Sequence, residues 1–165
     1  MACSSRQAGF TLIEAIVTMV IAAIVATIGA TVISGAFRNY FLGREIVQDS
    51  AQGTLALERM TRELRAIRSQ SDLTTMGLNT IAFVDTEGKS IDYALSGGAV
   101  TRSENGGAAQ PLADNVSALS FGYLKDDGKT AAATPAEVWY VTVTVTVTSQ
   151  NATTTYRGTV KPVNF

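Results

Sequence analysis

A single acidic residue interrupts a long apolar run near the start of the chain. Between Phe10 and Phe37, Glu14 is the only charged residue, and the run contains no proline. About 20 apolar residues are enough to span a bilayer, so this run predicts a membrane-spanning helix. A carboxylate inside hydrocarbon costs about 2.5–3.5 kcal/mol on insertion scales, and such residues usually have a function. Some other group must therefore compensate the charge of Glu14.

Two general interpretations of this segment can be weighed from the residues alone. A secretory signal peptide has an apolar stretch of about 7–15 residues before its cleavage site, and the run here is longer. A plain signal anchor fits the length but gives no reason for Glu14. One basic residue, Arg6, precedes the run, whereas Arg38 and Arg44 follow it. The distribution of positive charges therefore does not decide which end of the helix faces the cytoplasm.

The residues around the start of the run resemble a known processing site. Gly9-Phe10-Thr11-Leu12-Ile13-Glu14 is similar to the site at which type IV prepilins and type II secretion pseudopilins are cleaved. The resemblance includes the short leader with its basic residue, the glycine followed by phenylalanine, and the apolar stretch after the glutamate. It covers about 25 residues of the N-terminal segment.

The resemblance implies that the chain is the substrate of a processing enzyme. A prepilin peptidase is expected to cut between Gly9 and Phe10 and to methylate the new amino group of Phe10. Residues 1–9 would be the leader, which contains Cys3, the only cysteine. Glu14 is expected to pair with the N-terminal ammonium of a neighbouring subunit. Such a pair offsets the burial of both charges and fixes the register between helices.

The helical pattern continues beyond the apolar run. Apolar residues recur at three- and four-residue spacing and predict one buried stripe on a helix that extends from about Thr11 to Ser69. Residues 10–37 would form the transmembrane or filament-core part, and residues 38–69 the amphipathic part. The stretch Leu57–Arg65 resembles the corresponding helix of minor pilins and of J-type minor pseudopilins. The stripe consists of Leu57, Met60, Leu64 and Ile67.

From Gln70 onward the apolar period becomes two, which predicts antiparallel strands. A turn at Asp85–Lys89 joins two alternating stretches, and Val138–Thr148 has the most regular alternation of valine and threonine. A flat strand of this kind would pair with other chains if uncovered, so we expect it inside the sheet. The predicted fold class is α+β, with one long N-terminal helix packed on an antiparallel β-sheet head of residues 70–165, as in pilins.

The composition limits the chemistry that the chain can perform. It contains no histidine, which excludes a histidine-based triad and a Cys-His metal site. We therefore expect no catalytic residues, no cofactor and no metal. Asp126-Asp127-Gly128 could begin a calcium loop, but Glu137 is the only further carboxylate nearby, and a polar turn is favoured.

A row of four arginines raises the question of nucleic-acid binding. A solvated helix face is the favoured interpretation, because the formal net charge is −1 and no aromatic residues alternate with the arginines. We expect no nucleic-acid partner. The four are Arg59, Arg62, Arg65 and Arg68.

These observations predict a structural subunit of a type IV pilus or a type II secretion pseudopilus. The expected role is that of a minor subunit in filament assembly or initiation, with prepilin peptidase, sister pilins and the inner membrane as partners. The chain would cross the bacterial cytoplasmic membrane once, with its N-terminus in the cytoplasm and its head outside. Two alternatives remain: a pilus-borne module that binds DNA, a surface or a secreted substrate, and a plain membrane-anchored extracytoplasmic domain or enzyme.

Overall fold

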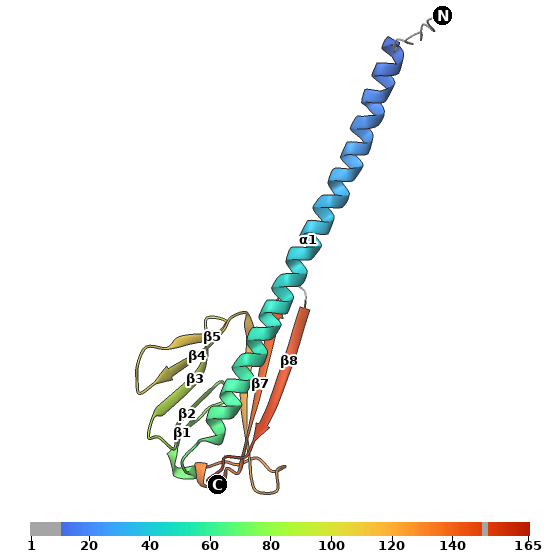
Figure 1. The fold of residues 1–165 in the computed structure, drawn as a ribbon. Helices are drawn as coiled ribbons and strands as arrows, with labels where there is room; N and C mark the ends of the chain where they lie inside the picture. Colours follow the sequence, from blue (N-terminus) through green and yellow to red (C-terminus); the bar gives the residue numbers. More distant parts are fainter. Residues whose placement is uncertain (1–10, 150–151) are drawn as a thin grey trace, which may run out of the picture. The chain divides into compact units, whose positions relative to one another are not determined.

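The structure is a computed structural model that describes residues 11–149 and 152–165 (Figure 1). Within these residues, one α-helix, α1 (Leu12–Arg65), is followed by eight strands and two short 3-10 turns. The described residues divide into two compact units, one that extends to Gly43 and one that comprises Arg44–Phe165. We call the second unit the head.

The first unit consists of the N-terminal part of α1, and its apolar side chains are exposed. Leu12, Met19 and Val32 are 83%, 73% and 66% exposed. The helix is long and apolar enough to cross a membrane, and no residue of its most apolar 18-residue stretch is buried. Its threonine hydroxyls donate to carbonyls of the same helix, as Thr31 Oγ1 does to Ile28 O at 2.7 Å. The hydroxyl groups are therefore satisfied without water, as a bilayer requires.

In the head, α1 buries one stripe against the strands. Of the predicted apolar stripe, Met60 and Leu64 are fully buried, and Leu57 is half-buried against the same core. The helix ends at Arg65, four residues before the predicted end. The reason is that Ile67 leaves the helix to form a β-bridge with Asp85, while Arg68 N donates to Val84 O at 3.1 Å.

Five strands form the first antiparallel sheet, in the order β1-β2-β3-β4-β5. The predicted turn between β2 and β3 is present, and Asp85 Oδ1 accepts hydrogen bonds from the backbone N–H groups of Glu87 and Lys89 at 2.9 Å. Two strands of this sheet, β1 and β5, were not predicted. The strands are β1 (Leu73–Met76), β2 (Thr80–Val84), β3 (Ser90–Ser96), β4 (Ala99–Glu104) and β5 (Gln110–Ala113).

Three strands form the second antiparallel sheet, β6 (Val116–Leu124), β7 (Tyr140–Ser149) and β8 (Ala152–Val160). The order β6-β7-β8 places β7 in the middle, which confirms the prediction for the valine–threonine strand. The valines of β7 are buried, whereas Thr148 is exposed and Thr144 and Thr146 are half-buried. This sheet therefore has an apolar inner face and a threonine-rich outer face.

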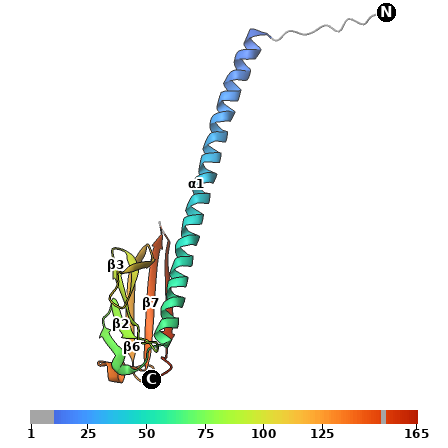
Figure 2. The same cartoon turned by 60° about the vertical axis from the view of Figure 1, so that its left-hand side comes forward.

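The head has one hydrophobic core to which α1 and both sheets contribute. Met60 of α1, Phe83 and Tyr93 of the first sheet, and Leu119 and Val143 of the second sheet belong to the same buried cluster. In both ribbon views the head part of α1 runs alongside β7 and β8 (Figure 2). The architecture is the predicted α+β layout of a long N-terminal helix packed on antiparallel sheets.

Candidate functional site

The first turn of α1 is stabilised by a hydrogen bond from its own N-terminal motif. Thr11 precedes the helix, and its Oγ1 accepts a hydrogen bond from the backbone N–H of Glu14 at 3.3 Å. Ala15 N also donates to Thr11 O at 3.1 Å. Threonine followed three residues later by glutamate is the sequence of a capping box, in which these side chains satisfy free N–H groups at the helix start.

Glu14 is exposed in the first helical turn. Negative charge at this position interacts favourably with the partial positive charge of the helix N-terminus. Within residues 11–149 and 152–165, no lysine or arginine forms an ion pair with Glu14. The carboxylate is therefore available for a positive charge from outside the described part of the chain. Gly9 and Phe10, the predicted cleavage and methylation site, lie outside the described residues.

A network of charged groups fastens the last turns of α1 to the first sheet. Glu63 accepts hydrogen bonds from the Tyr93 hydroxyl at 2.6 Å, from Arg102 Nε at 2.9 Å and from Arg59 Nε at 3.1 Å. Burial opposes ionisation of Glu63, but these three donors outweigh it and hold its pKa below the ordinary value. Burial and the hydrogen bond to Glu63 raise the pKa of Tyr93. The side chains of this network therefore all serve to hold α1 against the first sheet.

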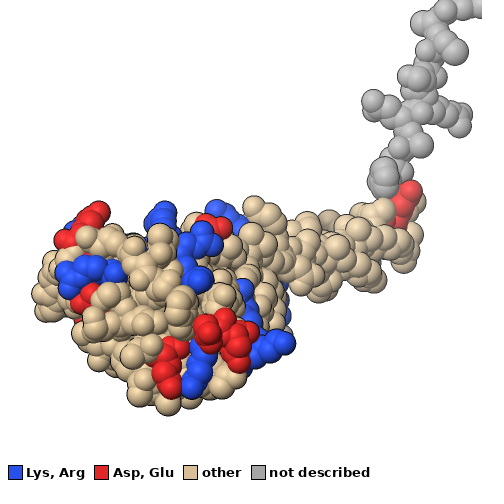
Figure 3. All heavy atoms as spheres, turned by 90° about the horizontal axis from the view of Figure 1, so that it is seen from below, with Lys and Arg blue, Asp and Glu red and all other residues tan. Residues whose placement is uncertain are grey.

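Two of the four arginines in the row form ion pairs with acidic side chains of the head. Arg59 is paired with Glu63, and Arg68 Nη2 lies 2.7 Å from Asp72 Oδ1. The hydrogen bonds from Arg68 and Ser69 lower the pKa of Asp72 to about 2. On the face of the head shown in Figure 3, basic and acidic side chains are interspersed. These contacts favour the interpretation of the row as a solvated helix face.

The loop that contains Asp126 and Asp127 is held by its own hydrogen bonds. Asp127 Oδ1 accepts from the backbone N–H groups of Lys129 and Thr130 at 2.8 Å, and its Oδ2 accepts from the Thr130 hydroxyl. The hydrogen bonds from Thr130 and Lys129 lower the pKa of Asp127. Among the described residues, no three His, Cys, Asp or Glu side chains gather in the way a metal site needs. The arrangement has the contacts of a polar turn.

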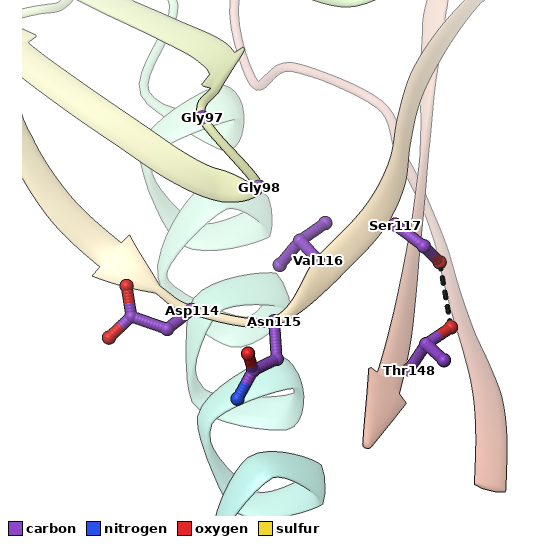
Figure 4. Close-up of a pocket in the computed structure, with 7 residues that line it drawn as sticks. All are labelled: Gly97, Gly98, Asp114, Asn115, Val116, Ser117 and Thr148. Carbon is purple, nitrogen blue, oxygen red and sulfur yellow. Dashed lines mark hydrogen bonds between the residues drawn. The ribbon is translucent and has the colours of Figure 1, made fainter. Parts of the chain in front are cut away.

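A shallow cavity of about 370 Å³ lies where the β3–β4 and β5–β6 turns meet β7 (Figure 4). Its lining contains one titratable side chain, that of Asp114, together with the Ser117 and Thr148 hydroxyls, which are 3.0 Å apart. The lining holds no second titratable side chain that could act with Asp114 in acid–base catalysis.

Beside this cavity, two contacts fasten the β5–β6 turn to α1. Asn115 Nδ2 donates to Asp49 Oδ2, and Asp114 N donates to Gln52 Oε1, both at 3.2 Å. Asp49 is 6% exposed, and Asn115 has a positive φ of 57° in the turn. This contact was not predicted, because nothing in the sequence relates Asp49 to a turn so far along the chain. The cap at Thr11 was not predicted either, although the spacing of Thr11 and Glu14 could have revealed it.

The fold and the N-terminal geometry together define a class of protein. A head with its own core follows an exposed apolar helix that has a single acidic residue in its first turn. The exposed apolar surface of this helix supports membrane anchoring, because lipid or other helices must cover it. Residues 4–35 match the family model described as the prokaryotic N-terminal methylation motif. This motif over residues 4–35 supports the type IV pilin and pseudopilin family and indicates a pilin-like protein. No curated protein has a significantly similar sequence.

The N-terminal methylation motif points to a structural protein. It implies processing by a prepilin peptidase and assembly with other pilins.

Proposed function

We propose that the chain is a minor structural subunit of a type IV pilus or a type II secretion pseudopilus, assembled after its leader is removed between Gly9 and Phe10. The observation that carries this proposal is the exposed apolar helix whose first turn bears Glu14, within the matched motif. The similarity of Leu57–Arg65 to the helix of minor subunits supports the minor role.

The proposed mechanism exchanges one apolar environment for another. Before assembly, the bilayer covers the exposed apolar side chains of α1, and the membrane stores the subunit. In the filament, neighbouring helices replace the lipid. Since lipid tails are as apolar as leucine, side-chain packing and polar contacts must drive this exchange, not hydrophobicity alone.

The Glu14 carboxylate would supply the polar contact. Removal of the leader creates an ammonium group on Phe10, and the ammonium of one subunit pairs with the Glu14 carboxylate of its neighbour. An ion pair in an apolar environment offsets a desolvation cost that neither charge can bear alone. The same pair sets the axial position of one helix on the next. The peptidase would act at the cytoplasmic face, with the head on the other side of the membrane.

The experiment compares Glu14→Ala and Glu14→Gln with the unchanged chain in cells that assemble the filament. We expect incorporation into sheared filaments to fall at least about tenfold in both variants, because the neighbouring ammonium remains buried without a partner. Mass spectrometry should show a methylated Phe10 at the N-terminus of the unchanged protein. Thr18→Ala, which removes a hydroxyl from the same helix, is the matched control and should assemble normally.

Two results would contradict the proposal. One is normal incorporation of both Glu14 variants. The other is an intact Met1 on the membrane-bound protein, which would indicate a plain signal anchor.

A further inference from the structure

The free edges of the two sheets in the head differ in how well they are protected against pairing with another strand. In the first sheet, the edge strands β1 and β5 have four residues each. The pairing of β1 with β2 and that of β5 with β4 both contain a register shift, and β5 carries Pro111, which has no N–H group. Short strands, irregular register and proline all discourage pairing with another chain.

In the second sheet, β6 is protected on the side away from β7. Phe121 N donates to Leu78 O at 2.7 Å and Val116 N donates to Gly98 O at 2.8 Å, so loops of the first sheet occupy this side. The pairing of β6 with β7 also contains a register shift, between Val116 and Ala118.

The edge formed by β8 has none of these protections. This strand has nine residues, contains no proline, and pairs with β7 in unbroken register from Ala152 to Val160. No described strand lies on its other side. A long, regular edge of this kind is a template for β-strand addition.

The backbone pattern shows which residues of β8 face the free edge. The backbone N–H of Thr148 in β7 donates to Asn115 O, which lies on the side of β6. Successive residues of a strand direct their backbone groups to opposite sides, so Val147 and every second residue from it form hydrogen bonds with β8. Their partners in β8, such as Thr154, use their backbone groups in the ladder with β7. The residues between them direct N–H and C=O groups to the free edge. These residues are Thr153, Thr155, Arg157 and Thr159.

The side chains on this edge define the chemistry of the strand that would fit. Thr153 and Thr155 already form hydroxyl contacts of 3.2 Å with Thr148 and Thr146 of β7. Threonine or valine on a new strand would continue this pattern of cross-strand pairs. Arg157 is the only charged residue in β6, β7 and β8, it is exposed, and no ion pair within the described residues involves it.

We propose that the free edge of β8 binds an extended segment of a different polypeptide, rich in threonine or valine, with an acidic side chain opposite Arg157. An unpaired guanidinium beside a row of free backbone groups favours a carboxylate and disfavours a cation. The proposal does not depend on the chain's being part of a filament, because it concerns only the strands of the head.

The test uses the full-length protein in detergent micelles and two fluorescent peptides. Both peptides copy β7 from Tyr140 to Ser149, and the residue that corresponds to Thr144, which faces Arg157 in the sheet, is glutamate in one and lysine in the other. We expect the glutamate peptide to bind with a Kd in the micromolar range at low salt, and the lysine peptide to bind at least about tenfold more weakly.

Two variants locate the binding on the free edge. Arg157→Glu should reverse the preference between the two peptides. Thr155→Pro removes an N–H group from the free edge without removing one from the ladder with β7, and it should weaken binding of the glutamate peptide at least about tenfold. Circular dichroism checks that each variant retains the fold.

Three results would overturn the proposal. The first is the absence of saturable binding of the glutamate peptide to the unchanged protein. The second is equal binding of both peptides to the unchanged protein and to Arg157→Glu. The third is self-association of the full-length protein that Arg157→Glu or Thr155→Pro abolishes in sedimentation experiments, because a second copy would then occupy the edge.

Discussion

At the scale of single residues, the charged groups of the head serve mainly to fasten α1 to the first sheet. Glu63 is the centre of this arrangement, since Tyr93, Arg102 and Arg59 all donate hydrogen bonds to it. Its pKa is lower in the folded protein than the ordinary value of 4.5. The unfolded chain therefore binds a proton at Glu63 more readily than the folded chain. Ionised Glu63 contributes its full stabilisation above the ordinary pKa of a glutamate, and this stabilisation is lost as the pH falls through the lower pKa of the folded protein.

Glu63→Gln should lower the free energy of unfolding by about 1–3 kcal/mol at pH 7, because two cationic donors and the tyrosine lose a charged acceptor. The difference from the unchanged protein should shrink as the pH falls below the ordinary pKa of a glutamate and through the lower pKa of folded Glu63. Urea unfolding of both proteins at pH 7 and in acid measures it. A difference that is equally large at both values of pH would contradict the assigned role of the Glu63 charge.

Glu14 was predictable from the sequence, whereas the contact that fastens the β5–β6 turn to α1 was not. Glu14 was predicted because a lone carboxylate in an apolar run is costly, a property of the local sequence. The contact between Asp49 and Asn115 could not be predicted, because it depends on where the β5–β6 turn lies against α1. Contacts between distant segments follow from the assembled fold, and no local pattern encodes them.

At the scale of elements, α1 comes so close to the second sheet that two positions require glycine. An ideal Cβ on Gly53 would lie 2.7 Å from Val147 Cγ2 and 2.9 Å from Tyr156 Cε2, and one on Gly158 would lie 2.8 Å from Thr61 Cγ2. These contacts are shorter than ordinary van der Waals distances. The close approach of helix and sheet therefore depends on these two residues.

Gly53→Ala should destabilise the head by about 1–3 kcal/mol, because valine is stiff and the core has no room for an added methyl group. The matched control is Gly43→Ala in the same helix, where nothing lies within 4 Å of the added Cβ. The control should leave the stability unchanged or raise it by up to about 1 kcal/mol through helix propensity. Urea unfolding measures both variants, and similar effects of the two substitutions would contradict the close packing.

The elements with regular periodicity were predicted correctly, and the irregular ones were missed. The stripe of α1 and the predicted strands β2, β3 and β7 bury apolar side chains at regular intervals, so burial imposes a period on the sequence. The strands β1 and β5 are four residues long and largely polar, which is too short for a period to be visible. The end of α1 was placed too late because Ile67 fits the helical stripe, although it is buried as part of a β-bridge.

At the scale of the whole molecule, the two units have opposite relations to solvent. Among the described residues, the buried hydrophobic core lies in the head, whereas most of the large apolar side chains of the first unit are exposed. The head therefore contains the interactions that stabilise its own fold, and the first unit depends on an apolar environment.

A fragment of residues 44–165 should dissolve without detergent and fold independently. We expect its urea unfolding midpoint to equal that of the full-length protein in detergent, because the first unit contributes no residue to the core. The full-length protein should need detergent or lipid to remain in solution. A fragment that requires detergent, or that unfolds at much lower urea concentration, would contradict the division into two units.

The central position of β7 also protects the head against aggregation, and this protection is lost when the head unfolds on heating. Its alternating valines and threonines carry no charge and no proline, which is the composition of segments that stack into cross-β fibrils. In the folded head both edges of β7 are occupied, by β6 and β8. Thermal opening of this sheet would release the segment and lead to irreversible aggregation. The useful lifetime of the head would then depend on the height of the unfolding barrier more than on the equilibrium between folded and unfolded chains.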